Sequence, residues 1–245
     1  QGLKLPTTVD GLRNAVRAVL PKALPSPYHA TITGLDQPVG DVLAVANEAA
    51  LLVPQLAKLV GSIYSSSKFG ENEDSVHSLI DALVLDPMKI IGDGADCIFK
   101  WNRNGIDASG ATVKGLRPDV LMWLPSGVLA FKGEDKALES DIGMARCELL
   151  TKLGNFSDTF FGQAQYQICY AAGGSLLEFL VITRDLSCGR PSCSSLTDQV
   201  NLSTVRGRSL CVRYAINIAR VLVSLQRAHP EGSVVRLGSR ITTHS

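Results

Sequence analysis

The sequence contains no apolar run that approaches the roughly 18 residues of a membrane-spanning helix. It also lacks a basic start followed by an apolar segment, so no signal peptide is readable, and the first residue is Gln1 rather than Met. We therefore expect a fragment or a processed form, with no membrane partner. A G-x-x-x-x-G-K-[ST] loop is also missing, which disfavours a P-loop nucleoside triphosphatase.

Clustered metal-binding cysteines are absent too. The six cysteines are scattered singly except for Cys188 and Cys193, and the four histidines lie far from that pair, which disfavours a zinc finger. A chain of 245 residues does not need disulfides, so we expect free thiols. Aromatic residues make up only 6%, but 45% of residues are hydrophobic, enough for one large domain or for one domain with a small appendage.

Lysine is absent from the last quarter of the chain. Residues 184–245 contain nine arginines and three acidic residues, a net charge of +6, whereas the whole chain carries +1. The body of the protein is therefore acidic and its C-terminal part is basic. That asymmetry suits a nucleic acid or an acidic partner.

Hydrophobic periodicity predicts an α/β fold, with helices before residue 90 and strands mixed with helices after it. The predicted helices are Asp10–Leu20, Val42–Ile63 with a kink at Pro54, Glu73–Leu85 closed by Asp86-Pro87, Ser140–Leu153, Phe160–Ala172 and the amphipathic Arg208–Ala228. The predicted strands are Cys97–Trp101, Val120–Leu124, Val128–Phe131 and Leu177–Thr183. The middle two form a hairpin around a Pro-Ser-Gly turn, and a linker rich in Ser, Pro and Gly follows Cys188.

The candidate chemistry lies where this hairpin ends. Asp119 opens its first strand, and Glu134 and Lys136 follow its second strand two positions apart, so these two share a face. Because paired strands lie about 4.8 Å apart, the three side chains can converge. Two carboxylates suit Mg²⁺ or Mn²⁺, and the lysine can orient or deprotonate a metal-bound water that attacks a phosphodiester. The alternative is a solvated strand end with Asp119 in a turn.

The pattern Pro118-Asp119 followed by Glu134-x-Lys136, in this order of elements, resembles the PD-(D/E)xK nuclease superfamily. The wider sequence is similar to the restriction-endonuclease-like domain of crinkler effectors, through Arg-Pro-Asp, an apolar strand, Phe-Lys-Gly-Glu-Asp-Lys-Ala and Ala-Arg-Cys-Glu-Leu-Leu-Thr-Lys-Leu. The resemblance covers residues 71–185. It implies a restriction-endonuclease-like core, in which helices flank a central mixed sheet, followed here by the C-terminal helix.

The resemblance also implies a set of site residues. The catalytic residues would be Asp119, Glu134 and Lys136, and the metal ligands would be Asp119, Glu134, the backbone carbonyl of Asp135, and Glu73 on the preceding helix. Glu73 equally fits an ordinary helix N-terminus, where acidic side chains interact favourably with the dipole. Gln163 with Tyr166, or Gln167 with Tyr170, resembles the glutamine-tyrosine helix motif of RecB-like nucleases, although the spacing is three where the family has four.

Several polar residues are candidates for contact with nucleic acid. They are Arg117 and Lys132 beside the hairpin, Gln163, and Arg213, Arg220 and Arg227 on the last helix. Together with Arg206, the helix arginines recur every seven residues, so they drift by only about 20° along one face. They predict a track for phosphates, a dock for an acidic domain surface, or a solvated face.

We therefore expect a Mg²⁺- or Mn²⁺-dependent nuclease that acts on DNA, or on RNA. By resemblance it belongs to an effector that is secreted into a host cell, enters the nucleus and carries a kinase-like domain beyond this chain. The rival hypothesis is an inactive module that regulates the kinase-like domain or binds a host protein. The expected organisation is an N-terminal arm or small subdomain (1–40), a nuclease-like domain (41–190), and a linker with a helical extension (191–245).

Overall fold

The computed structural model describes residues 4–20, 24–26, 43–45, 54–64, 72–104, 112–154, 166–184 and 190–228. Its helices are α1 (Val9–Arg17), α4 (Pro54–Tyr64), α5 (Glu73–Ile80), the π-helical turn η1 (Asp81–Leu85), α6 (Asp86–Asp93), the 3₁₀ turn η2 (Glu139–Asp141), α7 (Ile142–Thr151) and α9 (Val205–Ala228). Its strands are β1 (Leu24–Ser26), β2 (Leu43–Val45), β3 (Lys100–Arg103), β4 (Val120–Trp123), β5 (Leu129–Lys136), β6 (Tyr166–Gly173), β7 (Leu176–Arg184), β8 (Pro191–Ser195) and β9 (Val200–Asn201). Among these residues, no helix combines the length and the hydropathy needed to span a membrane.

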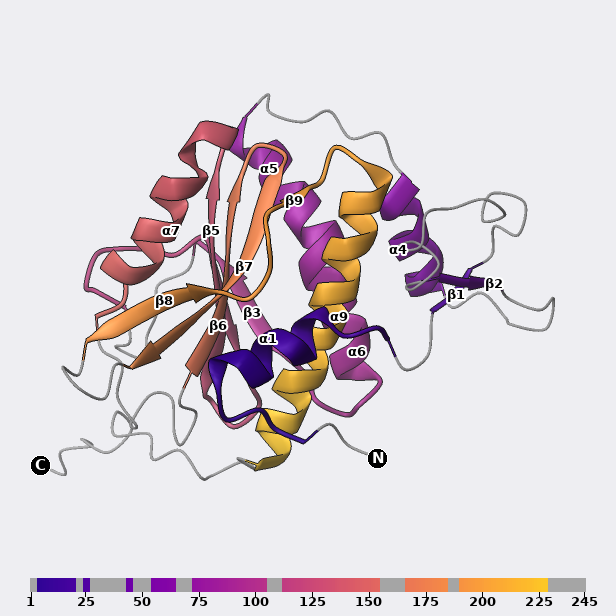
Figure 1. The fold of residues 1–245 in the computed structure, drawn as a ribbon, viewed down its shortest axis with the longest axis horizontal. Helices are drawn as coiled ribbons and strands as arrows, with labels where there is room; N and C mark the ends of the chain where they lie inside the picture. Colours follow the sequence, from indigo (N-terminus) through magenta and orange to yellow (C-terminus); the bar gives the residue numbers. More distant parts are fainter. Residues whose placement is uncertain are drawn as a thin grey trace, which may run out of the picture.

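A seven-stranded mixed sheet forms the centre of the molecule (Figure 1). Its strand order is β3-β4-β5-β6-β7-β8, and β9 pairs with β7. β5 and β6 run parallel and are joined through α7, whereas the other pairs are antiparallel. The predicted α/β class and the predicted hairpin, formed by β4 and β5, are confirmed.

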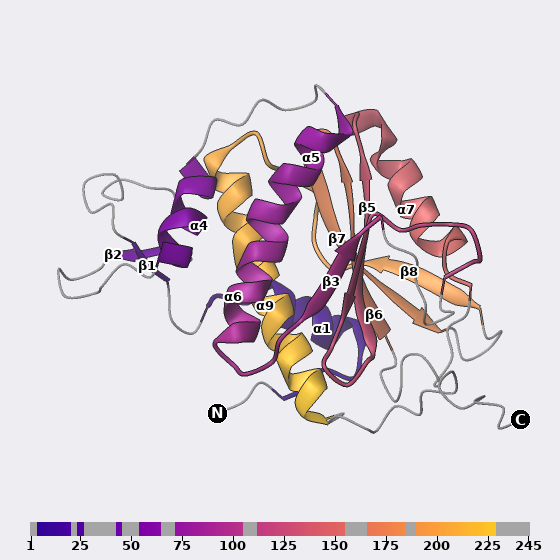
Figure 2. The ribbon, with the colours of Figure 1, turned by 180° about the vertical axis from the view of Figure 1, so that it is seen from behind.

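Helices cover both faces of this sheet, as the opposite views of Figures 1 and 2 show. α7 packs on one face, where Ala145 and Leu149 join a small core with Leu121 and Cys169. A larger core on the other face includes residues of α1, α5, α6 and α9. α9 lies within this layer and contacts α1, α4 and α6. The predicted C-terminal helix is therefore confirmed, and most of its residues are buried.

The helix predicted over Phe160–Ala172 is wrong where the chain is described, because Tyr166–Gly173 form β6. β6 lies between β5 and β7, and all its residues are buried. A central strand with both faces covered loses the alternation of polar and apolar residues, so periodicity cannot distinguish it from a helix. The glutamine-tyrosine helix motif therefore fails at Tyr166, and Gln163 lies outside the described residues.

Two prolines have roles other than those predicted. Pro54 begins α4 instead of kinking a longer helix, and Leu43–Val45 form a strand. Proline suits a first helical turn because its missing N–H has no intrahelical partner there. Asp86-Pro87 does not end the helix, because the π-helical turn η1 precedes it and Pro87 falls in the first turn of α6.

The edges of the sheet also differ from the prediction. The linker expected after Cys188 is wrong at β8 and β9, which pair with β7 and extend the sheet. β8 is rich in serine and only partly buried, so it carries no apolar signal. The strand expected over Cys97–Trp101 begins instead at Lys100, and as an exposed edge strand it shows little hydrophobic pattern.

Gly133 allows an aromatic ring to lie directly over β5. A Cβ atom at this position would lie 1.9 Å from Cε1 of Tyr170. The same ring lies near Phe131, with a centroid separation of 5.7 Å, and its hydroxyl donates to Asp135 Oδ2 at 3.3 Å. Tyr170 therefore fixes the last residues of β5 from the neighbouring strand.

Gly133→Ala should destabilise the protein by about 1–3 kcal/mol or more, because the Tyr170 ring must move away from β5. Gly143→Ala is the matched control, since a Cβ atom at that position in α7 meets nothing within 4 Å, and it should be neutral or slightly stabilising. Urea unfolding measures both changes. A Gly133→Ala variant as stable as the wild type would contradict the close packing.

Candidate active site

The β4–β5 hairpin brings the predicted acids to one end of the sheet. Val120 pairs with Gly133, so Asp119 and Glu134 occupy the next position on each strand. Asp119 is 7% exposed, and its Oδ2 accepts a hydrogen bond of 2.7 Å from the backbone N–H of Asp135. A nearly buried carboxylate therefore closes this end of the hairpin.

On one face of this end, α5 supplies two further side chains of kinds that bind metals in proteins. A carboxylate oxygen of Glu73, one of Asp119 and a ring nitrogen of His77 all lie within 4.8 Å of one another. Asn72 caps α5 by accepting a hydrogen bond from the Ser75 N–H, which fixes the start of this helix. Glu73 therefore lies beside Asp119, as predicted. His77 was not predicted, although its spacing of four from Glu73 places both on one helix face.

Asp135 forms a buried ionic network on the same face. Its side chain has no exposed surface, and Arg103 Nη1 donates to its Oδ2 at 2.8 Å. Arg103 also donates to Asp81 Oδ1 at 2.8 Å and to the carbonyl of His77 at 3.0 Å. Oδ1 of Asp135 has no hydrogen-bond partner among the described residues. The sequence predicted a role only for the Asp135 carbonyl, whereas its carboxylate joins β5 to β3 and α5.

Glu134 and Lys136 contact α7 on the other face. Oε2 of Glu134 accepts a hydrogen bond from Lys152 Nζ. Lys152 pairs with Glu148 at 2.8 Å, and Glu148 pairs with Lys136 at 2.8 Å. Glu134 is fully buried, and its Oε1 has no partner within the described part of the chain. The shared face of Glu134 and Lys136 is thus confirmed by their linkage through α7.

Glu148 and Lys152 were not predicted as site residues. Their spacing of four in Cys-Glu-Leu-Leu-Thr-Lys is the available signal, because it allows an ion pair along one helix face. Their partners on β5 could not be inferred from that spacing, since they depend on how α7 crosses the sheet.

Burial controls the titration of the two acids on β5. It raises the pKa of Glu134 to about 8, although the hydrogen bond from Lys152 opposes the shift and the charge of Asp119 adds to it. Burial also raises the pKa of Asp135, against the opposing effect of Arg103. For Lys136 and Lys152, burial lowers the pKa, but their carboxylate partners raise it more, so both amines stay charged.

The predicted phosphate-binding residues near the hairpin lie in different environments. Arg117 is exposed. Lys132 has no exposed surface and donates to the carbonyl of Leu149 at 3.1 Å, beneath α7. The prediction that Lys132 contacts a phosphate is therefore wrong, because a lysine on this central strand faces the core between the sheet and α7.

The arginines of α9 are partly engaged within the protein. Arg213 lies 5.4 Å from the ring centroid of Tyr214, and Arg220 Nη1 donates to Asn217 Oδ1 at 3.0 Å. Both side chains are half-buried, whereas Arg227 is exposed. A phosphate track along this helix stays a prediction.

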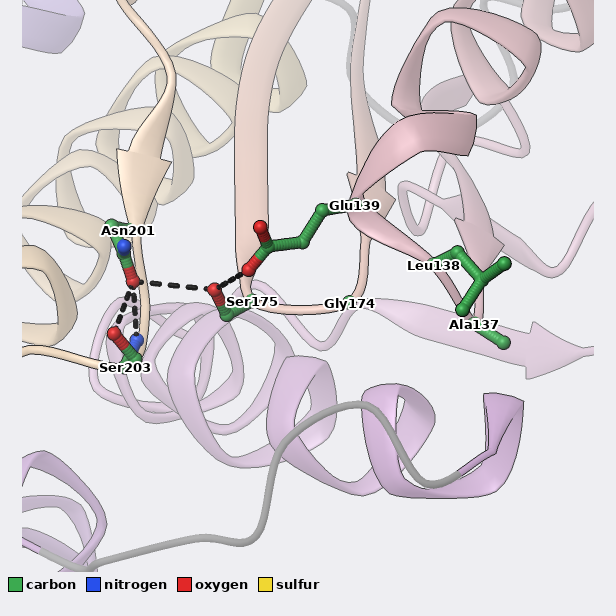
Figure 3. A pocket seen from close by; sticks show the side chains of 7 residues that line it. All are labelled: Ala137, Leu138, Glu139, Gly174, Ser175, Asn201 and Ser203. Atoms are coloured by element: carbon green, nitrogen blue, oxygen red, sulfur yellow. Dashed lines mark hydrogen bonds between the residues drawn. The ribbon is translucent and has the colours of Figure 1, made fainter.

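A hollow of about 310 Å³ lies beyond the end of β5 (Figure 3). It is lined by Ala137, Leu138, Glu139, Gly174, Ser175, Asn201 and Ser203. Its polar side chains bond one another, since Ser175 contacts both Glu139 and Asn201, and Asn201 Oδ1 accepts from the Ser203 N–H. Because no predicted site residue lines this hollow, the candidate site is the end of the hairpin.

Glu134→Gln should change how stability depends on pH when a chelator removes metal ions. Between about pH 4.5 and pH 8, the folded protein keeps a proton on Glu134 that the unfolded chain releases, so this group lowers wild-type stability as pH rises. Between pH 5 and pH 8.5, the free energy of unfolding of the variant should therefore increase relative to that of the wild type by a few kcal/mol, at about 1.4 kcal/mol per pKa unit. Chemical unfolding at both pH values measures this gain, with the exposed Asp198→Asn as control. Parallel pH profiles of variant and wild type would contradict the shift.

Arg103→Met should destabilise the protein by about 3–5 kcal/mol, because it leaves the buried Asp135 carboxylate without its cation. Adding Asp135→Asn should restore part of this loss, since the amide carries no charge to compensate. A double-mutant cycle measured by urea unfolding gives the coupling energy. Simple additivity of the two losses would show that the pair is not coupled.

Comparisons of the chain with protein-family models, with curated proteins and with solved structures find no match. The assignment of a function therefore rests on the geometry of the hairpin end and on the resemblance of its motif.

Proposed function

We propose that this domain is a metal-dependent nuclease that hydrolyses phosphodiester bonds of DNA. The observation that carries the proposal is the convergence of Glu73, His77 and Asp119 within 4.8 Å, beside the Glu134-x-Lys136 strand end. Two of these three residues were predicted metal ligands. They come from α5 and from the start of β4, so the fold brings together residues that are far apart in sequence.

The side chains fit a divalent cation. On the α5 side, Oδ1 of Asp135 and Nε2 of His77 are buried without a hydrogen-bond partner among the described residues, and buried polar atoms normally have one. The surrounding donors are carboxylate oxygens, which Mg²⁺ and Mn²⁺ prefer, together with one imidazole. Asp119 and Glu73 would hold the ion on the α5 face, whereas Glu134, the third predicted carboxylate ligand, bonds Lys152 on the α7 face. When bound, such an ion polarises a phosphoryl oxygen and activates water.

Lys136 has a defined part in this proposal. Glu148 holds its ammonium at 2.8 Å, and the side chain is 20% exposed, so it can reach a substrate at the surface. Because its carboxylate partner keeps it charged, Lys136 would donate hydrogen bonds to a water or a phosphoryl oxygen. We propose that Lys136 orients the water and stabilises the charge on the phosphoryl oxygen, and that it does not act as the base.

The ion pairs on the α7 face favour a second candidate function. Glu148 pairs with both Lys136 and Lys152, and Lys152 also donates to Glu134, so the groups of this face bind one another without any substrate. Such a network also suits a non-catalytic module that regulates a kinase-like domain or binds a host protein. In that case the acids at the hairpin end would act only in folding.

A cleavage assay separates the two functions. Supercoiled plasmid, single-stranded DNA and RNA should be tested with Mg²⁺, Mn²⁺ and a chelator. We expect metal-dependent cleavage of DNA that falls by about 10²-fold or more in Asp119→Asn, which removes a proposed metal ligand, and in Lys136→Met, which removes the proposed donor to the water or phosphoryl oxygen. Lys89→Met, which removes an exposed lysine paired with Asp93 on α6, should cleave like the wild type.

Two results would contradict the nuclease proposal. No cleavage of any substrate by the folded wild type, or equal cleavage by all variants, would leave the non-catalytic module as the function.

A further inference from the structure

We propose that His77 is a metal ligand and that it makes this site select a divalent transition-metal ion such as Mn²⁺ over Mg²⁺. The inference rests on the proposed function for the existence of a metal site, and it adds the identity of one ligand and the class of ion. The ligand set would be Glu73, His77 and Asp119.

The position of the imidazole supports this role. Nε2 of His77 lies 3.7 Å from Glu73 Oε1 and 3.6 Å from Asp135 Oδ2. This nitrogen is buried and has no hydrogen-bond partner among the described residues, although the ring as a whole is 16% exposed. Both distances are too long for hydrogen bonds, so this buried nitrogen lacks a partner that a bound ion would supply.

Asp135 provides a second, independent indication. Its carboxylate is completely buried, its Oδ2 lies 3.6 Å from Nε2 of His77, and its Oδ1 has no partner within the described chain. Arg103 and Tyr170 hold the other oxygen in place. Asp135 thus adds fixed negative charge beside the nitrogen that would bind the ion, while Oδ1 of Asp74 lies 3.7 Å from Nδ1, the ring nitrogen that usually faces a carboxylate when a histidine binds a metal.

Glu134 belongs to the other side of the strand. Successive residues of β5 face opposite sides, and Glu134 bonds Lys152 while Asp135 bonds Arg103. Lys152 therefore supplies the positive charge near Glu134. The α5 face supplies the ligands for a single ion.

The donor set determines which ion is favoured. Mg²⁺ binds oxygen ligands and keeps several of its waters. Imidazole nitrogen instead suits first-row transition metals. Two carboxylates and one imidazole should therefore bind Mn²⁺ more tightly than Mg²⁺, and replacing His77 by an oxygen ligand should reduce the difference.

The test measures Mn²⁺ binding to the purified protein by electron paramagnetic resonance, with Mg²⁺ as competitor. The wild type should bind one Mn²⁺ at least tenfold more tightly than Mg²⁺, and pulsed spectra should show coupling to a directly bound imidazole nitrogen. His77→Gln should abolish the nitrogen coupling and weaken Mn²⁺ binding about tenfold or more. His77→Asp should bind Mn²⁺ without nitrogen coupling and should bind Mg²⁺ more tightly than His77→Gln does. Asp93→Asn, on an exposed turn of α6, should behave like the wild type.

The outcomes separate this inference from the nuclease proposal. Mn²⁺ bound through Asp119, and lost in Asp119→Asn, but without nitrogen coupling in the wild type would overturn the role of His77 and leave the nuclease proposal standing. Nitrogen coupling from His77 without cleavage of any nucleic acid would support the metal site and overturn the nuclease. Absence of Mn²⁺ binding in the wild type would overturn both.

Discussion

The end of β5 depends on one interaction, the ion pair between Arg103 and the fully buried carboxylate of Asp135. A buried carboxylate is tolerated only when a cation and hydrogen bonds compensate for its lost hydration. Arg103 does this from the edge strand β3, which β4 separates from β5, and its other donors bind Asp81 and the carbonyl of His77. One guanidinium therefore holds β3, β5 and the α5–η1 helix together.

From this anchor, the alternation of a strand divides the site into two halves. Asp135 faces α5 with its His77 and Glu73, whereas Glu134 faces α7 with its Lys152. The backbone N–H of Asp135 joins the halves through Asp119. An ion on one face and an ammonium on the other would then approach a substrate from both sides of a single strand end. Such an arrangement accommodates two positive charges without placing them in contact.

The sequence predicted what depends on local pattern and on the hairpin. Asp119 lies beside the end of β5, as expected, because a tight turn fixes which residues pair across two strands. The sequence could not predict that Lys132 is buried or that Asp135 forms an ion network, because both depend on which helix covers which face of the sheet. β6 was misassigned for the same reason, since burial on both faces removes the period that identifies a strand. Glu73 was correctly placed beside Asp119, but its neighbour His77 required the orientation of α5 relative to the sheet.

The π-helical turn η1 sets that orientation. It joins α5 to α6 over Asp81–Leu85 and contributes packing residues to the larger core. A helix of this kind carries an extra residue relative to an α-helix, so the segments before and after it are out of phase. Loss of one residue from η1 would rotate α5 by about 100° while α6 kept its packing on α9. The length of this turn thus determines which side of α5 faces the sheet, and because α5 and η1 both supply buried residues to the larger core, an insertion or deletion there would change the chemistry at the sheet and the packing of the core together.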